Sequence, residues 1–303
     1  MTFDPGLVHT PLTPFAPDRR VDFDRYGRSI EFHLCQGAQA LAVPMHVGES
    51  VSLPDAEKRE LLTFAVKTAA KRAPVIAHVS DAGTGIAAAL ARHAEAAGAA
   101  AIVATTPYYW TPPLAMILEH FFQIGAAVDI PFFVLNAPDD MAGIKINADL
   151  AMKLVARLPN FVGVVDASLD WQFMIELLTE AARLRPDFKL VAGTELMVSA
   201  GAIGATGMFS ALAVIAPKLV RQLFDLCRQQ KLFEARAAQE EIAALCQILK
   251  PGGIAALKAA ARGLGRDYGD PRPPLLPLDG AAEKTLLAEI DVLPALAAEP
   301  RGW

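Results

Sequence analysis

Three side chains suited to proton-transfer chemistry stand at the ends of short apolar runs in this 303-residue chain. His46 and His78 each follow a run with the composition of a buried strand, and Glu195 follows a third. Imidazole titrates near neutral pH, so either histidine could serve as a general base. Two histidines and a carboxylate could instead bind a divalent metal that polarises a carbonyl group. The simplest hypothesis needs no cofactor and has the histidines hydrogen-bonded around a pocket, with the metal kept as an alternative.

A further carboxylate, two tyrosines and a lysine are also candidates. Glu49 follows Gly48 and could act as an acid or a base, although a carboxylate at such a turn can equally accept backbone N–H bonds and fix the loop, which is the role we favour. Tyr108 and Tyr109 lie in a loop flanked by prolines, which favours a pocket or an interface. Lys145 could form an imine with a carbonyl substrate, and its ordinary role would be that of a solvated charge.

These candidates must be positioned by alternating strands and helices. Eight β-rich runs, each followed by apolar residues at helical spacing, span residues 7–10, 40–43, 75–79, 102–105, 132–135, 162–165, 190–192 and 205–209. Eight strand–helix units are the number that closes a TIM or (β/α)₈ barrel, whose active site lies at the carboxyl ends of the strands. We therefore predict such a barrel over residues 1–228.

Further helical patterns follow the eighth unit. They cover residues 232–249, 254–262 and 281–296, which predicts a C-terminal helical extension over residues 229–303 packed on the barrel. Ser52 and Asp55 are expected to cap the helix after the second strand. The rival fold, an open doubly wound sheet, normally has a glycine-rich loop after its first strand, and Thr10-Pro11-Leu12-Thr13-Pro14 is no such loop.

Composition excludes several classes of protein. The formal charge is −5, from 28 Lys and Arg against 33 Asp and Glu, and no basic run exceeds a pair, so nucleic acid is not an expected partner. Residues 96–118 and 196–217 are free of charge but are interrupted by prolines or glycines, and we interpret them as core rather than membrane spans. The three cysteines show no Cys-x-x-Cys spacing, and no signal-peptide pattern begins the chain, which indicates a cytoplasmic protein.

Several short segments, in their order and spacing, resemble one family of barrel enzymes. They include Thr10-Pro11-Leu12, Gly48-Glu49, Pro107-Tyr108-Tyr109, Asn136-Ala137-Pro138 and Asp166-Ala167-Ser168. Together they are similar to the dihydrodipicolinate synthase and N-acetylneuraminate lyase family. The resemblance implies the barrel fold, a homodimer or homotetramer, and lyase or aldolase chemistry on a small oxo-acid or carbonyl compound. It also implies that Tyr109 reaches into the pocket of a neighbouring subunit.

The same resemblance implies that the usual catalytic groups are replaced. The lysine that forms an imine with the substrate would stand at Val165, and the proton-relaying tyrosine at Leu135. His46 and Val47 occupy the places of the paired threonines. The arginine expected shortly after Pro138 is absent, and residues 139–140 are both aspartate. A valine cannot form an imine, so the family's mechanism is not expected in this chain.

We therefore predict a divergent lyase or aldolase-like enzyme that acts on a small carbonyl or oxo-acid compound without a lysine imine. The alternative is a catalytically inactive barrel that binds a metabolite or serves as a partner subunit. The expected partner is a small-molecule substrate, with neither nucleic acid nor membrane. Candidate catalytic residues are His46, Tyr109 and His78, and candidate substrate-binding residues are Tyr108, Glu49, Asn136, Val165, Leu135, Glu195 and Ile203.

Overall fold

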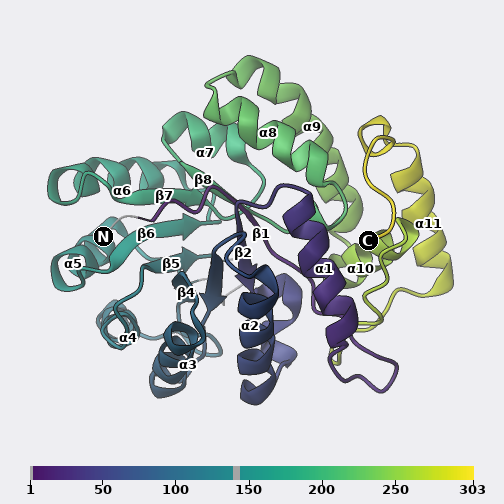
Figure 1. Ribbon diagram of the computed structural model, residues 1–303. Coiled ribbons are helices and arrows are strands. Elements are labelled where there is room, and N and C mark those ends of the chain that lie inside the picture. The colour runs from purple at the N-terminus through teal and green to yellow at the C-terminus, as the bar shows by residue number, and fades with distance from the viewer. Residues whose placement is uncertain (1–2, 139–143) are drawn as a thin grey trace.

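The strands of this protein close into a barrel of eight parallel strands in chain order (Figure 1). The computed structural model describes residues 3–138 and 144–303. Pairing of His9 with Ser210 and of Val8 with Phe209 joins the first strand to the last. The strands are β1 Leu7–His9, β2 Ala40–Val43, β3 Val75–His78, β4 Ala101–Thr105, β5 Phe132–Asn136, β6 Phe161–Asp166, β7 Lys189–Ala192 and β8 Gly207–Ser210. The predicted barrel is confirmed.

Helices follow each strand and surround the barrel (Figure 1). The barrel helices are α1 Phe23–Cys35, α2 Asp55–Ala69, α3 Thr84–Ala97, α4 Leu114–Gly125, α5 Ala148–Arg157, α6 Trp171–Leu184, α7 Met197–Ile203 and α8 Pro217–Arg228. Short 3₁₀ helices occur at η1 His46–Gly48, η2 Ser50–Ser52 and η3 Leu212–Val214. Helix α2 has Pro54 at its N-cap, with no side-chain cap. The predicted cap is wrong because Ser52 still belongs to η2 and Asp55 is already the first helical residue.

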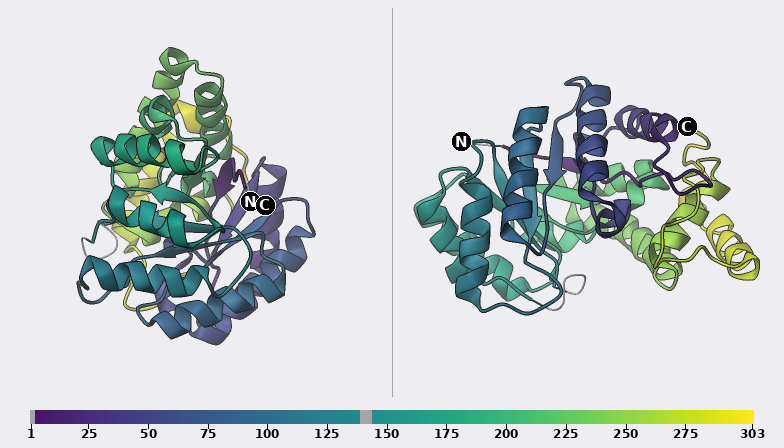
Figure 2. Two further views of the ribbon diagram at one scale, coloured as in Figure 1. Left: turned by 90° about the vertical axis from the view of Figure 1, so that its left-hand side faces the viewer. Right: turned by 90° about the horizontal axis from the view of Figure 1, so that it is seen from below.

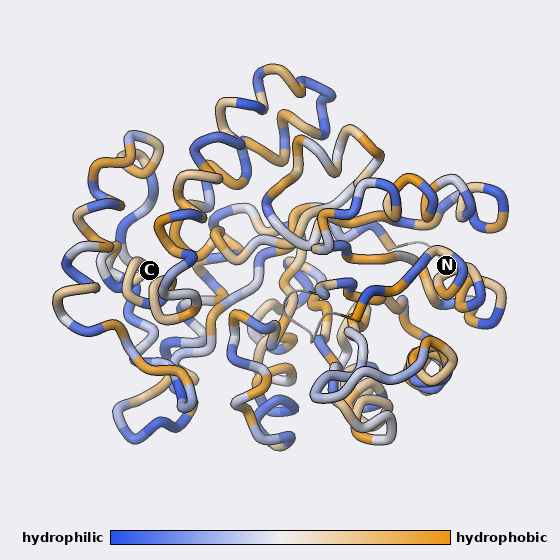
Figure 3. The backbone as a smooth tube through the Cα atoms, turned by 180° about the vertical axis from the view of Figure 1, so that it is seen from behind, coloured by the Kyte–Doolittle hydropathy of each residue, from blue (hydrophilic) through white to orange (hydrophobic). Residues whose placement is uncertain are grey.

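Alternation along each strand produces two apolar layers, because successive strand side chains point to opposite faces. On β6, Val165 belongs to the cluster that fills the barrel, whereas its neighbour Val164 packs in the layer between strands and helices. Phe3 packs on Phe133 inside the barrel, with ring centroids 6.0 Å apart, near the amino-terminal end of β5. Seen from behind, hydrophobic and hydrophilic stretches alternate along the surrounding helices (Figure 3), as expected for helices with one face on the barrel. The inside of the barrel and the layer between strands and helices are thus both apolar.

The extension consists of α9 Leu232–Leu249, α10 Gly253–Gly263, α11 Gly280–Asp291 and the 3₁₀ helix η4 Pro294–Leu296. Helix α9 packs on α7 and α8, and α10 and α11 pack on each other and on α9 at one end of the molecule (Figure 2). The predicted final helix is too long, since it ends at Asp291 shortly before Pro294, which cannot donate a backbone hydrogen bond. In the described residues no single helix is both long and apolar enough to cross a membrane, and only α9 and α10, bent by 111°, pass that test as a pair.

Candidate active site

A cavity of about 200 Å³ opens at the carboxyl ends of the barrel strands. Its position is the one at which barrels of this type carry active sites. Polar groups come from the ends of β1, β2, β7 and β8, and apolar groups from β5, β6 and the loop after β2. The lining residues are Thr10, Met45, His46, Val47, Leu135, Ala137, Ala167, Gly193, Thr194, Glu195, Phe209, Ser210 and Ala211. Of the sequence candidates, the cavity brings together His46, Leu135 and Glu195.

Glu195 is the only carboxyl group among the described residues that line this cavity. The hydroxyl of Ser210 donates to its Oε1 at 2.8 Å, and the backbone N–H of Leu212 donates to the same oxygen at 2.9 Å. From α9, the side-chain amide of Gln239 donates to the backbone carbonyl of Glu195 at 2.8 Å. The bonds from Ser210 and Leu212 both end on Oε1, and Oε2 has no hydrogen-bond partner among the residues that the structure describes, so it can accept a bond from a ligand.

His46 lies at the start of η1, directly after β2, and is half-buried. Its loop is fixed by the Thr13 hydroxyl, which donates to the Gly48 carbonyl at 2.6 Å. A Cβ atom at Gly48 would lie 3.2 Å from the Pro11 carbonyl oxygen, so this close approach favours glycine. His46 Nδ1 is buried and has no hydrogen-bond partner within the described residues. The loop therefore presents an imidazole to the cavity from a rigid support.

His78 is held within the protein and lies outside the set of described residues that line the cavity. Its Nδ1 lies 3.0 Å from the Pro44 carbonyl oxygen, which must accept, and its Nε2 lies 2.7 Å from the Ser80 hydroxyl. Burial lowers the pKa of His78 to about 4. An imidazole with both nitrogens bonded and so low a pKa is neutral at pH 7 and cannot take a proton from a ligand. Of the two histidines, only His46 is placed for chemistry.

Glu49 is tied to the C-terminal extension. The Lys258 ammonium group lies 2.6 Å from its Oε1, and both side chains are almost fully buried. The backbone N–H of Arg272 donates to Oε2 at 2.7 Å. Both carboxylate oxygens are thus occupied, and Glu49 fixes the loop that carries His46 rather than contacting a substrate.

Asn136 and Asp166 form a brace between β5 and β6. The Asn136 amide donates to Asp166 Oδ1 at 2.6 Å, and the Ile146 N–H donates to Asn136 Oδ1 at 3.2 Å. The Ser168 hydroxyl lies 3.0 Å from both Asp166 oxygens, so this pair braces the chain directly after β6. Burial raises the pKa of Asp166. Asn136 is therefore engaged within the protein, and the structure does not place it on the cavity wall.

The tyrosine pair lies to the side of the cavity. Tyr108 is half-buried against the barrel's inner cluster, and burial raises its pKa. Tyr109 is 95% exposed, and its φ of 88° lies in the left-handed region that non-glycine residues rarely adopt. Within one chain neither side chain lines the cavity. The expected reach of Tyr109 into a neighbouring subunit stays a prediction.

The remaining candidates are apolar or on the surface. Val165 is fully buried in the barrel's inner cluster, between Leu135 and Val191 of the neighbouring strands. Ile203 ends α7 and packs among the helices, away from the cavity lining. Lys145 lies 3.6 Å from Asp170, and its side chain is about half exposed. The aspartates at positions 139 and 140 lie outside the described residues.

Sequence reasoning missed three polar residues of the cavity. Thr10 directly follows β1, Ser210 ends β8, and Thr194 lies two residues after the end of β7. The Thr10 hydroxyl donates to the Ser210 carbonyl at 3.0 Å, which joins the ends of β1 and β8. Inspection of the residue at each strand end would have found all three, because in a parallel barrel these ends meet at one mouth.

The described residues include no group of three His, Cys, Asp or Glu side chains arranged to bind a metal. The hypothesis that His46, His78 and Glu195 form such a group does not match this geometry. The bonds of His78 to Pro44 and Ser80 occupy both of its ring nitrogens.

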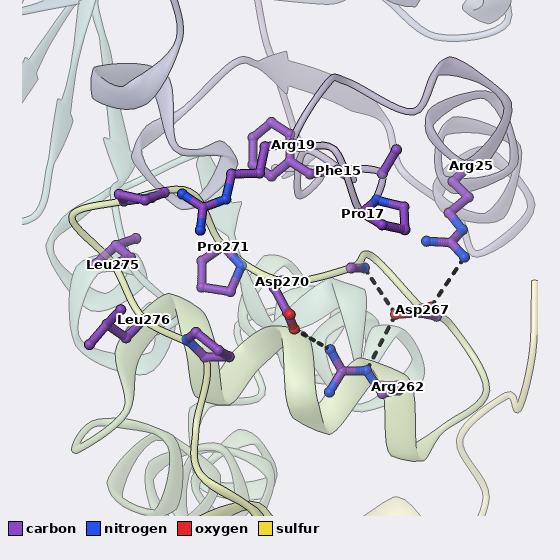
Figure 4. Close-up of a pocket in the computed structure, with 14 residues that line it drawn as sticks. Phe15, Pro17, Arg19, Arg25, Arg262, Asp267, Asp270, Pro271, Leu275 and Leu276 are labelled. Carbon is purple, nitrogen blue, oxygen red and sulfur yellow. Dashed lines mark hydrogen bonds and ion pairs between the residues drawn. The ribbon is translucent and has the colours of Figure 1, made fainter.

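A larger cavity of about 410 Å³ lies between the loop after β1 and the extension (Figure 4). Its charged groups largely neutralise one another. Arg262 lies 3.3 Å from Asp267 and 3.1 Å from Asp270, and Arg25 lies 3.3 Å from Asp267. Because it is walled by the extension and lacks the strand-end groups, it is a feature of the junction and not the candidate active site.

The closed parallel barrel and its strand-end cavity define a (β/α)₈-barrel protein with a pocket where barrel enzymes carry their active sites. Residues 4–292 match the model of the dihydrodipicolinate synthetase family, and the chain belongs to that family. The resemblance seen in the sequence is confirmed for family and fold.

Similar proteins cover nearly the whole chain. The 4-hydroxy-tetrahydrodipicolinate synthase of Caldicellulosiruptor bescii is 31% identical, over 87% of this chain and 88% of the relative. That of Mycolicibacterium paratuberculosis is 30% identical, over 94% of each chain. Among solved structures, the dihydrodipicolinate synthase of Aquifex aeolicus is 28% identical with a TM-score of 0.88, and the match covers 96% of this chain and 99% of that one.

Proposed function

We propose that this protein is a lyase or aldolase-like enzyme that acts on a small carbonyl compound without forming a lysine imine. The proposal draws its reaction class from the family, whose curated relatives are named as synthases. One observation carries the departure from an imine. Val165 stands where the resemblance expects the lysine, and the described residues that line the cavity include no amine.

The groups in the cavity support acid–base chemistry. To cleave a carbon–carbon bond, a base takes the proton of a hydroxyl group, which becomes a carbonyl as the bond breaks. The electron pair of that bond passes into the neighbouring carbonyl to give an enolate, which then takes up a proton. His46 is the proposed base and returns this proton. Glu195, held by Ser210 and Leu212, orients the hydroxyl group of the substrate.

Product release and covalent trapping should be measured on the same sample. The purified protein is incubated with a panel of hydroxy-aldehydes, hydroxy-ketones and hydroxy-2-oxo acids, and cleavage is followed by proton NMR. Aliquots are treated with borohydride and analysed by intact-protein mass spectrometry. We expect cleavage with no reduced adduct. An adduct on any lysine, in step with turnover, would overturn the imine-free mechanism.

Substitution of the proposed base tests its role. His46→Gln should lower kcat/KM by about 10²–10⁴-fold, the usual contribution of a general base. His93→Gln is the matched control, because His93 lies on α3, where its ring is bonded to Thr63 and to the Arg59 carbonyl. Equal activity in both variants would remove His46 from the mechanism.

The alternative function is a catalytically inactive barrel that binds a metabolite or serves as a partner subunit. It is favoured by the replacement of lysine and tyrosine positions by Val165 and Leu135 in a partly apolar cavity. A thermal-shift screen detects ligands without requiring turnover. Ligands that raise Tm but are recovered unchanged would support this alternative over the lyase.

We also propose a cytoplasmic homodimer or homotetramer. The exposed Tyr109, next to the half-exposed Trp110, supports an interface at this loop. Light scattering on the intact chain should give two or four times the chain mass of 32.3 kDa. Tyr109→Glu is expected to shift the equilibrium toward the monomer, whereas a monomeric native protein would contradict the proposal.

A further inference from the structure

We infer that the cavity selects an uncharged hydroxy-carbonyl compound and disfavours one that carries a carboxylate. The inference rests on the proposed site and specifies the class of its substrate. It departs from the 2-oxo acids that the family resemblance would suggest. What carries it is the distribution of charge around the strand-end cavity, together with the way in which Glu195 is held.

Apart from the imidazole of His46, the charge that lines the cavity has one sign. Glu195 is its one carboxyl group, and the described lining residues include no lysine or arginine. Residues 139–143, which the structure does not describe, contain no lysine, arginine or histidine either. Neither Lys258, which is paired with Glu49, nor Lys145, which lies 3.6 Å from Asp170, belongs to the described lining of the cavity. A bound carboxylate would therefore meet a like charge with no strong cation to offset it.

The geometry of Glu195 instead favours a ligand group that donates a hydrogen bond. Ser210 and Leu212 both bond to Oε1, and within the described part of the chain nothing bonds to Oε2, which can therefore accept a hydrogen bond from a ligand hydroxyl. Two carboxylates brought close together against the apolar walls of this cavity repel each other more strongly than in bulk water, because less water lies between them. A hydroxyl group on Oε2 gains a charge-assisted hydrogen bond at the same place. The same atom thus attracts one class of ligand and repels the other.

The rest of the lining fits a short carbon skeleton. Met45, Val47, Leu135 and Phe209 supply apolar contacts, and His46 supplies a nitrogen near the ligand carbonyl. The volume of about 200 Å³ is below the range usual for drug-sized ligands. A compound of a few carbon atoms with one carbonyl and one or two hydroxyl groups meets these conditions.

Two ligands that differ at a single carbon give the sharpest test. Dihydroxyacetone and hydroxypyruvate share a hydroxymethyl ketone, and one has a second hydroxymethyl group where the other has a carboxylate. Affinities are measured on the intact native protein by calorimetry and by ligand-observed NMR at pH 7.5. We expect dihydroxyacetone to bind at least about tenfold more tightly. Equal or tighter binding of hydroxypyruvate, or no detectable binding of dihydroxyacetone, would overturn the inference.

Two variants connect the preference to the cavity charge. Glu195→Gln retains the shape and the acceptor oxygen but removes the charge, so the preference should fall below about threefold. Leu135→Arg adds a guanidinium group beside Glu195 and should shift the preference toward hydroxypyruvate. Glu180→Gln, an exposed position on α6, is the matched control and should leave the ratio unchanged. An unchanged ratio in Glu195→Gln would show that its charge does not select the ligand.

The binding and turnover experiments test the inferred ligand class and the proposed lyase separately. If dihydroxyacetone binds preferentially but no member of the panel is cleaved, the inferred ligand class stands and the proposed lyase falls. If the protein cleaves hydroxy-2-oxo acids faster than neutral analogues, the lyase stands and the inferred class falls.

Discussion

Val165 offers no nucleophile at the position where the family resemblance expects a lysine. The side chain is fully buried on the inner face of β6, among Phe133, Leu135 and Val191. A branched hydrocarbon there adds to the packed interior of the barrel and offers no nucleophile. In the proposed mechanism, proton transfer therefore falls to His46 after β2, while Glu195 after β7 orients the substrate.

A lysine introduced at this position should not restore family chemistry. Val165→Lys is expected to lower the free energy of unfolding by at least about 3 kcal/mol, because it buries an amine among apolar side chains. Val165→Met is the matched control for length and should cost about 1–2 kcal/mol through overpacking alone. Urea denaturation measures both. A Val165→Lys variant that forms a borohydride-trapped pyruvate adduct and turns over normally would contradict the prediction.

At the scale of elements, the loop after β2 depends on the extension. Glu49 has a left-handed backbone with a φ of 58°, and its carboxylate is held by Lys258 of α10 and by the N–H of Arg272. The Lys258 ammonium and the Arg272 guanidinium lie over the Phe15 ring, 4.4 and 4.3 Å from its centroid. The extension thus fixes the orientation of His46 from a distance.

Removal of one partner of this buried pair should be costly. Lys258→Met leaves the Glu49 carboxylate without its cation and should destabilise the protein by about 3–5 kcal/mol. The double variant with Glu49→Gln should recover part of that loss, since no buried charge is then left unpaired. A double-mutant cycle in urea gives the coupling energy. Strictly additive effects would show that the two side chains do not stabilise each other.

The close approach of β6 to β7 at Gly163 provides a second prediction at this scale. At Gly163 of β6, a Cβ atom would lie 2.5 Å from the Lys189 carbonyl oxygen and 2.8 Å from the Phe133 ring. Gly163→Ala should therefore cost about 2–3 kcal/mol, because backbone of a paired strand cannot move aside. Gly85→Ala, in open space in the first turn of α3, should instead stabilise by up to about 1 kcal/mol. Thermal unfolding of the two variants should show Tm shifts of opposite sign.

For the whole molecule, buried histidines connect stability to pH. His9 of β1 and His33 of α1 are fully buried, with their Nδ1 atoms 3.1 Å apart between the strand and the helix. Burial lowers the pKa of His9 to about 3 and the pKa of His33 well below its ordinary value. Next to them, Arg266 donates to the carbonyls of Pro300 and Gly302 and so anchors the chain end. Buried polar groups of the barrel and of the extension therefore lie next to each other.

The unfolding free energy should fall as the pH falls from 6.5 toward 4. In this range the unfolded state binds protons at these histidines while the folded state does not, so acid favours unfolding. His78 alone, with its pKa lowered from 6.5 to about 4, should contribute about 3 kcal/mol of that loss. Urea titrations at successive pH values measure the slope, and His78→Gln should reduce it. A flat profile between pH 6.5 and 4 would contradict the prediction.

The barrel could be predicted from the sequence because its signals are local. Each strand is an apolar run that side chains on both faces bury, and each helix has apolar residues on one face. The order of the units then leaves few possible topologies. Element ends were less certain where local signals compete, as at Ser52 and at the helix that ends before Pro294.

The amino-acid sequence by itself determined the eight units, the family, and the presence of valine where an amine would be expected. The tertiary structure alone decided which strand-end groups share a cavity. His46 and His78 look equivalent in sequence, yet contacts with Pro44 and Ser80 keep His78 within the protein, while His46 lines the cavity with Glu195. The physical reason is that periodicity sets local conformation, whereas the direction of a side chain also depends on partners that only the fold brings near, such as the Pro44 carbonyl that lies 34 residues before His78.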